Sequence, residues 1–267
     1  MIADLGMNER FSKESPTVLA IETSGSLCEA AILKTDGTVA RLGLDLERGH
    51  AERVVELCTT LLREEAVEWS AVTHVAVNKG PGSFAGVRAG VAAARGFALS
   101  LAVPALGVSA FGATVEGWNA RRDGAADILL VLTDLRRGRI GAQIFAQTPS
   151  EGTIKAAGEP FSTEPDHIAL TLRPNASVGG PVDILSSLDA NGALLTRAVA
   201  SLRDSGIQAR VHTVPPSAEH VARVALNVLM EGRASPADPL YMRSADAVPA
   251  ARLPLLQDDA ARRREAV

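Results

Sequence analysis

A strand–turn–strand pattern that occurs twice is the feature that most constrains this fold. Residues 17–23 are apolar and largely β-branched, a short polar turn follows, and residues 27–33 form a second apolar run. Residues 130–134 and 139–145 repeat the arrangement around the turn Arg136-Arg137-Gly138. Helical and strand patterns follow the first pair, and the second restarts the same opening. A duplicated α/β fold of two lobes is therefore expected.

Composition excludes several classes of protein. The 267 residues carry a formal charge of -4, and 46% of them are hydrophobic, which excludes a wholly disordered chain. No apolar run approaches the roughly 18 residues of a membrane span. The acidic balance and the 3% of aromatic residues argue against a dedicated nucleic-acid binder. The first sixteen residues lack the apolar stretch of a signal peptide, so a cytoplasmic protein is expected.

A glycine-rich loop, Gly80-Pro81-Gly82-Ser83, joins a strand over residues 74–77 to a helix over residues 83–100. A serine nucleophile elbow needs glycine two places either side of the serine, and a phosphate-binding P-loop needs a following lysine; both are missing here. A dinucleotide fingerprint is closer, but the next strand carries no acidic residue to bind a ribose. A tight turn with Ser83 capping the helix is the default interpretation.

Two early helices carry unusual faces. Helix 50–65 has one apolar stripe, made of Ala51, Val54, Val55, Cys58, Leu61 and Leu62. Helix 83–100 has two distinct faces. One is an apolar seam that includes Phe84, Val87, Val91 and Ala94, and the other is a seam of very small residues that includes Gly86 and Gly90. Glycine inside a helix costs roughly 1 kcal/mol, so a packing reason is needed. Either the two helices pack on each other, or together they present a surface to another chain.

No catalytic constellation emerges from the residues. None of the five histidines has another four residues away, as a helical metal site would require. Cys28 and Cys58 lie in apolar patterns and are expected to be buried thiols. No metal, no cofactor and no catalytic residue are therefore expected.

Four segments resemble the TsaB (YeaZ-type) family, the dimerisation subunit of the bacterial tRNA threonylcarbamoyladenosine machinery. The motifs are residues 19–24 (Leu-Ala-Ile-Glu-Thr-Ser), the glycine motif 80–90, residues 134–138 and residues 239–243 (Pro-Leu-Tyr-Met-Arg). Glu22 stands where the family usually has Asp, and Ala85 stands where Thr is common.

The resemblance implies an actin-like, Hsp70-type ATPase (ASKHA) fold with duplicated mixed-sheet lobes, the second one reduced. The expected parts are an extension over residues 1–16, a first lobe of residues 17–109 plus 216–243, a second lobe of residues 110–215, and a tail from residue 244. The two strand turns would be vestigial phosphate loops, marked by Glu22, Thr23 and Ser24 in the first lobe and by Asp134 in the second. A late helix, residues 217–231, would pack back on the first lobe.

The resemblance also implies a non-catalytic scaffold that binds and activates a TsaD-type catalytic paralogue, which transfers threonylcarbamoyl to N6 of adenosine 37 in tRNA. The expected partner interface comprises Val54, Val55, Cys58, Leu61, Leu62, Phe84, Gly86, Val87, Arg88, Gly90, Val91 and Ala94. A TsaE-type ATPase would join the larger complex, the chain alone would form a homodimer, and tRNA would be reached only through the complex. The alternatives are a stand-alone actin-like ATPase, kinase or peptidase, and a tRNA-binding module that uses residues 136–139.

Overall fold

The computed structural model describes residues 16–120, 128–147, 153–172, 181–188, 192–233 and 235–242. The expected N-terminal extension, apart from residue 16, and the expected tail lie outside these residues, as does Arg243 of the fourth motif.

The first mixed sheet contains five strands in the order β3-β2-β1-β4-β5. Their bounds are β1 Val18–Glu22, β2 Leu27–Leu33, β3 Val39–Asp45, β4 His74–Asn78 and β5 Ala105–Val108. β1, β2 and β3 are antiparallel neighbours, whereas β4 and β5 continue the sheet from β1 in parallel. β1 and β4 are buried along their whole length, because helices cover both faces of this sheet.

The second sheet repeats this topology. Its strands are β6 Ile128–Asp134, β7 Ile140–Gln147, β8 Ile154–Ala156, β9 Phe161–Thr163, β10 Val182–Ser186 and β11 Ala209–Thr213. The order is β11-β10-β6-β7-β8, with β9 also paired to β7. As in the first sheet, two strands form an antiparallel hairpin, and two parallel strands follow on the other side of the first. The expected fold of two duplicated mixed-sheet lobes is thereby confirmed.

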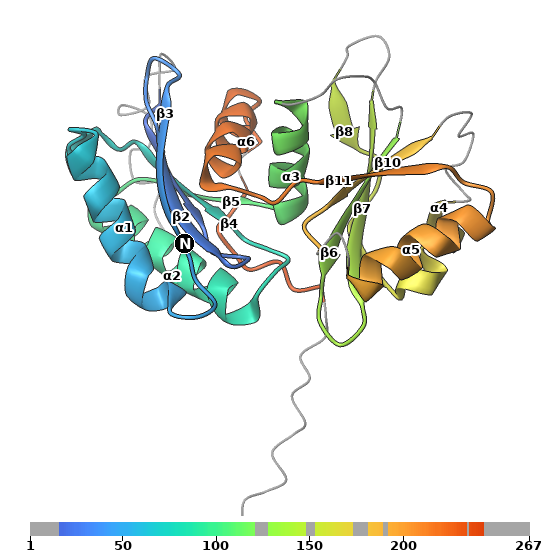
Figure 1. Ribbon diagram of the computed structural model, residues 1–267. Helices are drawn as coiled ribbons and strands as arrows, with labels where there is room; N and C mark the ends of the chain where they lie inside the picture. The colour runs from blue at the N-terminus through green and yellow to red at the C-terminus, as the bar shows by residue number, and fades with distance from the viewer. Residues whose placement is uncertain are drawn as a thin grey trace, which may run out of the picture.

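Helices on the two outer faces cover the sheets (Figure 1). α1 (His50–Glu64) and α2 (Phe84–Leu101) lie side by side on the outside of the first sheet, and the short η1 (Trp69–Ala71) follows α1. α5 (Ala193–Asp204), with α4 (Ile168–Leu172) and η2 (Pro165–His167), covers the second. The expected reduction of the second lobe holds for the short α4, β8 and β9, but this sheet has six strands against five.

Each of the two helices between the sheets follows the strands of one sheet along the chain and packs on the other sheet. α3 (Ala110–Asn119) follows β5 of the first sheet, yet its Phe111 and Val115 pack in one core with Leu129 and Leu185 of the second. α6 (Ala218–Met230) follows the second sheet and packs on β1 and β2 of the first. This exchange ties the lobes together through their cores.

Local signals fix the ends of several elements, among them the expected cap at Ser83. The Ser83 hydroxyl accepts a hydrogen bond from Gly86 N at the start of α2, and Ser217 caps α6 in the same way. Gly232, with φ of 67°, follows the end of α6, and Gly37 takes φ of 82° in the β2–β3 hairpin. The two serines satisfy backbone N–H groups that the start of a helix leaves free, and the two glycines take left-handed backbone angles that suit a turn.

Candidate functional site: the glycine loop and the outer face of α1 and α2

The β1–β2 turn is built around a buried carboxylate. Glu22 Oε1 accepts a hydrogen bond from Ser24 N over 2.6 Å, and Oε2 accepts one from Asn78 Nδ2 over 2.5 Å. Asn78 also donates to the Ser24 hydroxyl and accepts from Gly80 N, so one amide links the turn to the glycine loop. Burial raises the pKa of Glu22. The carboxyl group that marks this expected phosphate loop therefore faces the interior.

The glycines of α2 let the helix approach this turn closely. A Cβ atom on Gly86 would lie 2.0 Å from the carbonyl oxygen of Thr23, and one on Gly90 would lie 2.3 Å from the Thr23 hydroxyl. That hydroxyl donates to the carbonyl of Gly86 over 2.8 Å, while Ser83 N donates to Ser24 O over 2.7 Å. Gly86 and Gly90 thus pack on the chain's own β1–β2 turn, and this close approach is a packing reason for two glycines inside the helix.

Most of the expected interface residues lie inside the first lobe. The structure buries Val54, Cys58, Leu61, Leu62, Gly86, Val87, Gly90, Val91 and Ala94. Their helical spacing identifies the buried faces of the two helices. A pattern along one helix does not reveal which molecule covers such a face. Of the predicted set, Val55, Phe84 and Arg88 are exposed.

The outward surface of α1 and α2 carries a different apolar group. Val55 is 50% exposed, Phe84 59% and Leu99 85%. Gly96, also on α2, is exposed and has no heavy atom within 4 Å of the position a Cβ would take. We call Val55, Phe84, Leu99 and Tyr241 the outer apolar group. The sequence prediction missed Leu99; the available signal was a large apolar side chain outside both predicted seams.

Tyr241 reaches this surface because residues 235–242 cross the edge of the first sheet. Gly107 N donates to Ser235 O, and Leu240 N donates to Lys79 O over 2.7 Å. Tyr241 then lies 6.0 Å from Phe84 between ring centroids. Arg88 stacks on Phe84, with its Cζ 3.6 Å from the ring centroid, and donates through Nε to the Tyr241 hydroxyl. An ion pair between Arg95 and Asp238 fixes the same segment to α2.

The second expected phosphate loop lies at the β6–β7 turn. Asp134 Oδ1 accepts from Arg136 N over 2.5 Å, so this carboxylate supports its own turn. Arg136 and Arg137 take φ angles of 67° and 53°, and their side chains are exposed. Bulky arginines thus occupy positions where a phosphate-binding loop presents backbone N–H groups.

Metal clusters and membrane-spanning helices are both absent from the described residues. They contain no group of three or more His, Cys, Asp or Glu side chains placed to hold a metal ion. None of their helices is long and apolar enough to cross a membrane.

Comparison with known proteins relates this chain to proteins of tRNA modification. Residues 44–163 match the family model described as TsaD, tRNA N6-adenosine threonylcarbamoyltransferase. The tRNA threonylcarbamoyladenosine biosynthesis protein TsaB of Escherichia coli is 34% identical over 124 residues, which are 46% of this chain and 52% of that protein. TsaB of Bacillus subtilis is 32% identical over 48% of this chain and 55% of its own length.

A solved structure, YeaZ from Pseudomonas aeruginosa, has the same fold. It superposes with a TM-score of 0.66 over 85% of this chain and 99% of its own, at 23% sequence identity. The chain is therefore similar to TsaB and YeaZ proteins in sequence and in fold. The chain spans about half the length of these two TsaB proteins. The residues matched by the family model include the glycine motif at the start of α2.

Proposed function

We propose that this chain is a non-catalytic subunit in the synthesis of threonylcarbamoyladenosine in tRNA, and that it binds a TsaD-type catalytic paralogue through the outer face of α1 and α2. Binding would activate that paralogue for threonylcarbamoyl transfer to N6 of adenosine 37. A TsaE-type ATPase would join the larger complex, and without the paralogue two copies of this chain would pair through the same face. All of this would take place in the cytoplasm.

One observation carries the proposal. Seven large hydrophobic side chains are exposed among the described residues, and the outer apolar group supplies four of them. The other three, Leu170, Val211 and Met230, lie on α4, β11 and α6. Singly exposed apolar residues are ordinary on protein surfaces. Phe84 and Tyr241 are neighbours, however, and Arg88 stacks on the first ring and donates to the hydroxyl of the second, which is the composition of an interface hot spot.

The polar groups of the first turn support a structural role for it. Glu22, Thr23 and Ser24 are all buried, and each of their side chains forms hydrogen bonds within the first lobe. The Ser83 hydroxyl is likewise bound to the N-terminus of α2. Groups with these partners would have to break them before they could bind a phosphate or attack a substrate, which supports catalysis by the partner.

Activation by such a subunit has a thermodynamic requirement. The chain must bind the active arrangement of the paralogue more tightly than its inactive one, because equal affinity for both would shift nothing. The rigid attachment of α2 to β1 through Thr23 and Gly86 suits this role, since a stiff surface loses little conformational entropy on binding.

The test is the affinity of the full chain for a TsaD-type paralogue from the same organism, measured by titration calorimetry. We expect Phe84→Ala combined with Leu99→Ala to weaken binding at least tenfold, or about 1.4 kcal/mol. Met230→Ala, which removes an equally exposed side chain on α6, is the matched control and should bind like the wild type. The proposal would be contradicted if the wild-type chain did not bind the paralogue, or if Met230→Ala lost as much affinity as the double variant.

The alternative enzyme activities receive a separate test. Calorimetry of the isolated chain with ATP and Mg²⁺ would favour a stand-alone ATPase or kinase if it showed tight binding. Cleavage of a peptide library by the isolated chain would favour a peptidase. The proposal predicts neither.

A further inference from the structure

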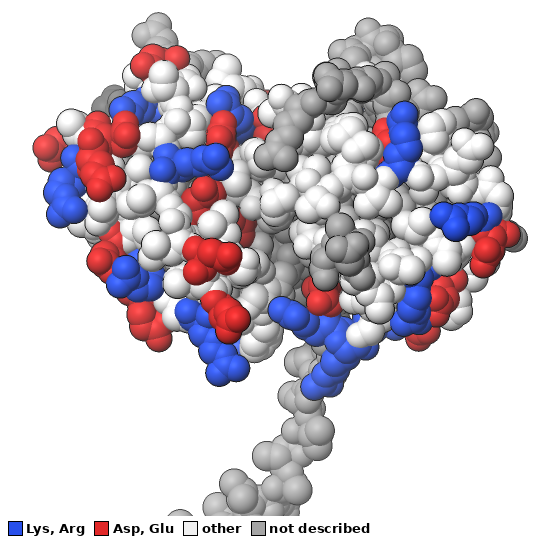
Figure 2. Space-filling model, viewed as in Figure 1, with Lys and Arg blue, Asp and Glu red and all other residues white. Residues whose placement is uncertain are grey.

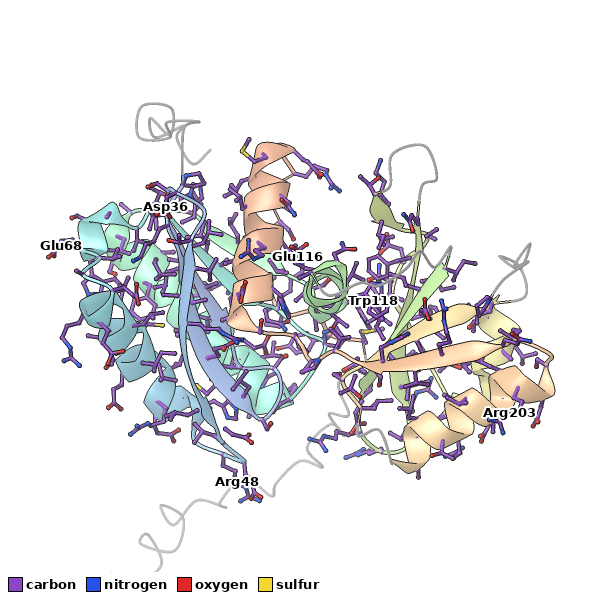
Figure 3. All side chains as sticks on the ribbon, turned by 45° about the horizontal axis from the view of Figure 1, so that its top comes forward. Asp36, Arg48, Glu68, Glu116, Trp118 and Arg203 are labelled. Carbon is purple, nitrogen blue, oxygen red and sulfur yellow. The ribbon has the colours of Figure 1, made fainter. Side chains whose placement is uncertain are left out.

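The β6–β7 turn carries the densest group of basic side chains in the described residues, and the proposed function leaves it unused. Arg136, Arg137 and Arg139 lie within four residues, opposed locally by Asp134. Figure 1 shows this turn at the lower end of the second lobe, beyond both sheets. Figure 2 shows Lys and Arg side chains at the lower edges of both lobes. Arg48, labelled in Figure 3, lies at that end of the first lobe.

The fold does not require arginine at this turn. The equivalent β1–β2 turn of the first lobe connects its two strands with Ser24, Gly25 and Ser26. In the second lobe, Arg136 and Arg137 both take left-handed φ angles. Such angles cost a non-glycine residue roughly 1–2 kcal/mol, whereas glycine takes them freely. Side chains kept at strained positions point to a role other than turn formation.

The turn holds its arginines on a rigid support. Leu135 N donates to Arg139 O, and Arg139 N donates to Arg136 O, so the loop is closed by its own backbone. Arg139 is fixed to β9, donating through Nε to the hydroxyl of Ser162 and through Nη2 to its carbonyl. The side chain of Arg136 is 79% exposed, and its Nη1 lies 3.6 Å from Asp134 Oδ2. A contact of that length and exposure leaves donors available to an external anion.

Guanidinium groups match phosphate oxygens in charge and geometry, and they stay charged at every physiological pH. The chain as a whole is acidic, so a polyanion would have to meet a local basic site. Charges further away than about 8 Å are largely screened at physiological salt. From this geometry we infer that the Arg136–Arg139 turn binds the phosphate backbone of RNA. The choice of RNA rests on the proposed function, whose substrate is a tRNA.

The experiment measures binding of a fluorescent tRNA transcript to the full-length chain by anisotropy, from 50 to 200 mM salt. The variant is Arg136→Gly with Arg137→Gly, because glycine keeps the left-handed backbone while removing both guanidinium groups. We expect at least a tenfold loss of affinity at 50 mM salt with the melting temperature retained. The slope of log K against log salt should become shallower by about 1.5, as for the loss of two phosphate contacts.

Two further variants make the test specific. Arg136→Lys with Arg137→Lys keeps the charges and should retain most of the affinity. Arg203→Ala removes one positive charge from α5, on a distant part of the second lobe (Figure 3), and should bind like the wild type. Equal losses for Arg203→Ala and the glycine pair, or unchanged binding by the glycine pair, would overturn the inference.

The same variants separate this inference from the proposed function. Assembly with the paralogue is measured independently, and the glycine pair should assemble normally. If Arg136→Gly with Arg137→Gly no longer bound the paralogue but still bound RNA, the turn would be a protein contact and the inference would be wrong. If the wild-type chain bound RNA through the turn but never the paralogue, the proposed function would fail and the inference would stand.

Discussion

The carboxylate of Glu29, on β2, accepts a hydrogen bond over 2.7 Å from the backbone N–H of Ala218, the first residue of α6. The two residues are 189 positions apart. A carboxylate at a helix N-terminus satisfies a free N–H group and interacts favourably with the helix dipole. This contact attaches the late helix to the first sheet at its buried end.

Glu29 should make stability depend on pH. Burial raises its pKa above the ordinary value of 4.5, with the bond from Ala218 and the charge of Arg41 acting in the opposite direction. A carboxyl group with a raised pKa contributes stability at pH below 4.5 and loses it as pH rises through the folded-state pKa. Urea unfolding of Glu29→Gln should therefore show the variant gaining relative to the wild type from pH 4.5 upward. A difference that stays constant with pH would contradict this.

The glycines of α2 should respond oppositely to alanine. Gly86→Ala places a methyl group 2.0 Å from a backbone oxygen, and should cost at least about 2 kcal/mol of unfolding free energy. Gly96→Ala, in the same helix with open space around it, should gain about 0.5–1 kcal/mol from helix propensity. Chemical denaturation of both variants checks the pair. If Gly86→Ala had the same unfolding free energy as the wild type, α2 would not approach Thr23 as closely as the structure shows.

Both cysteines should be unreactive in the folded protein. Burial raises the pKa of Cys28 to about 11 and that of Cys58 to about 12. The thiolate is the reactive form, so few thiolates exist near pH 8. A thiol reagent such as dithionitrobenzoate should label neither residue in buffer and both in denaturant. Rapid labelling of the native chain would refute the prediction.

Tyr241 should matter more for binding than for stability. Its ring and hydroxyl hold Arg88 on the outer face of α2, where the side chains are exposed. An exposed cation–π contact is worth about 0.5–1 kcal/mol. Tyr241→Ala should therefore change the unfolding free energy by no more than about 1 kcal/mol while lowering the affinity for the paralogue severalfold. A large loss of stability with unchanged affinity would assign Tyr241 a purely structural role.

The sequence by itself determined the local elements and their repetition. Strand runs, the Ser83 and Ser217 caps and the Gly37 and Gly232 turns depend on neighbouring residues, so their positions follow from short patterns. The two strand–turn–strand openings also predicted the duplicated sheets. Burial of Cys28 and Cys58 followed from the same apolar spacing.

Tertiary structure alone decided which surfaces stay open. Helical periodicity identified the buried faces of α1 and α2, but nothing in it showed that the chain's own sheet covers them. Contacts between residues far apart in sequence settled that point: Gly86 and Gly90 on Thr23, and Tyr241 on Phe84. Such contacts depend on where the fold places each element in space, and periodicity along one helix holds no information about that.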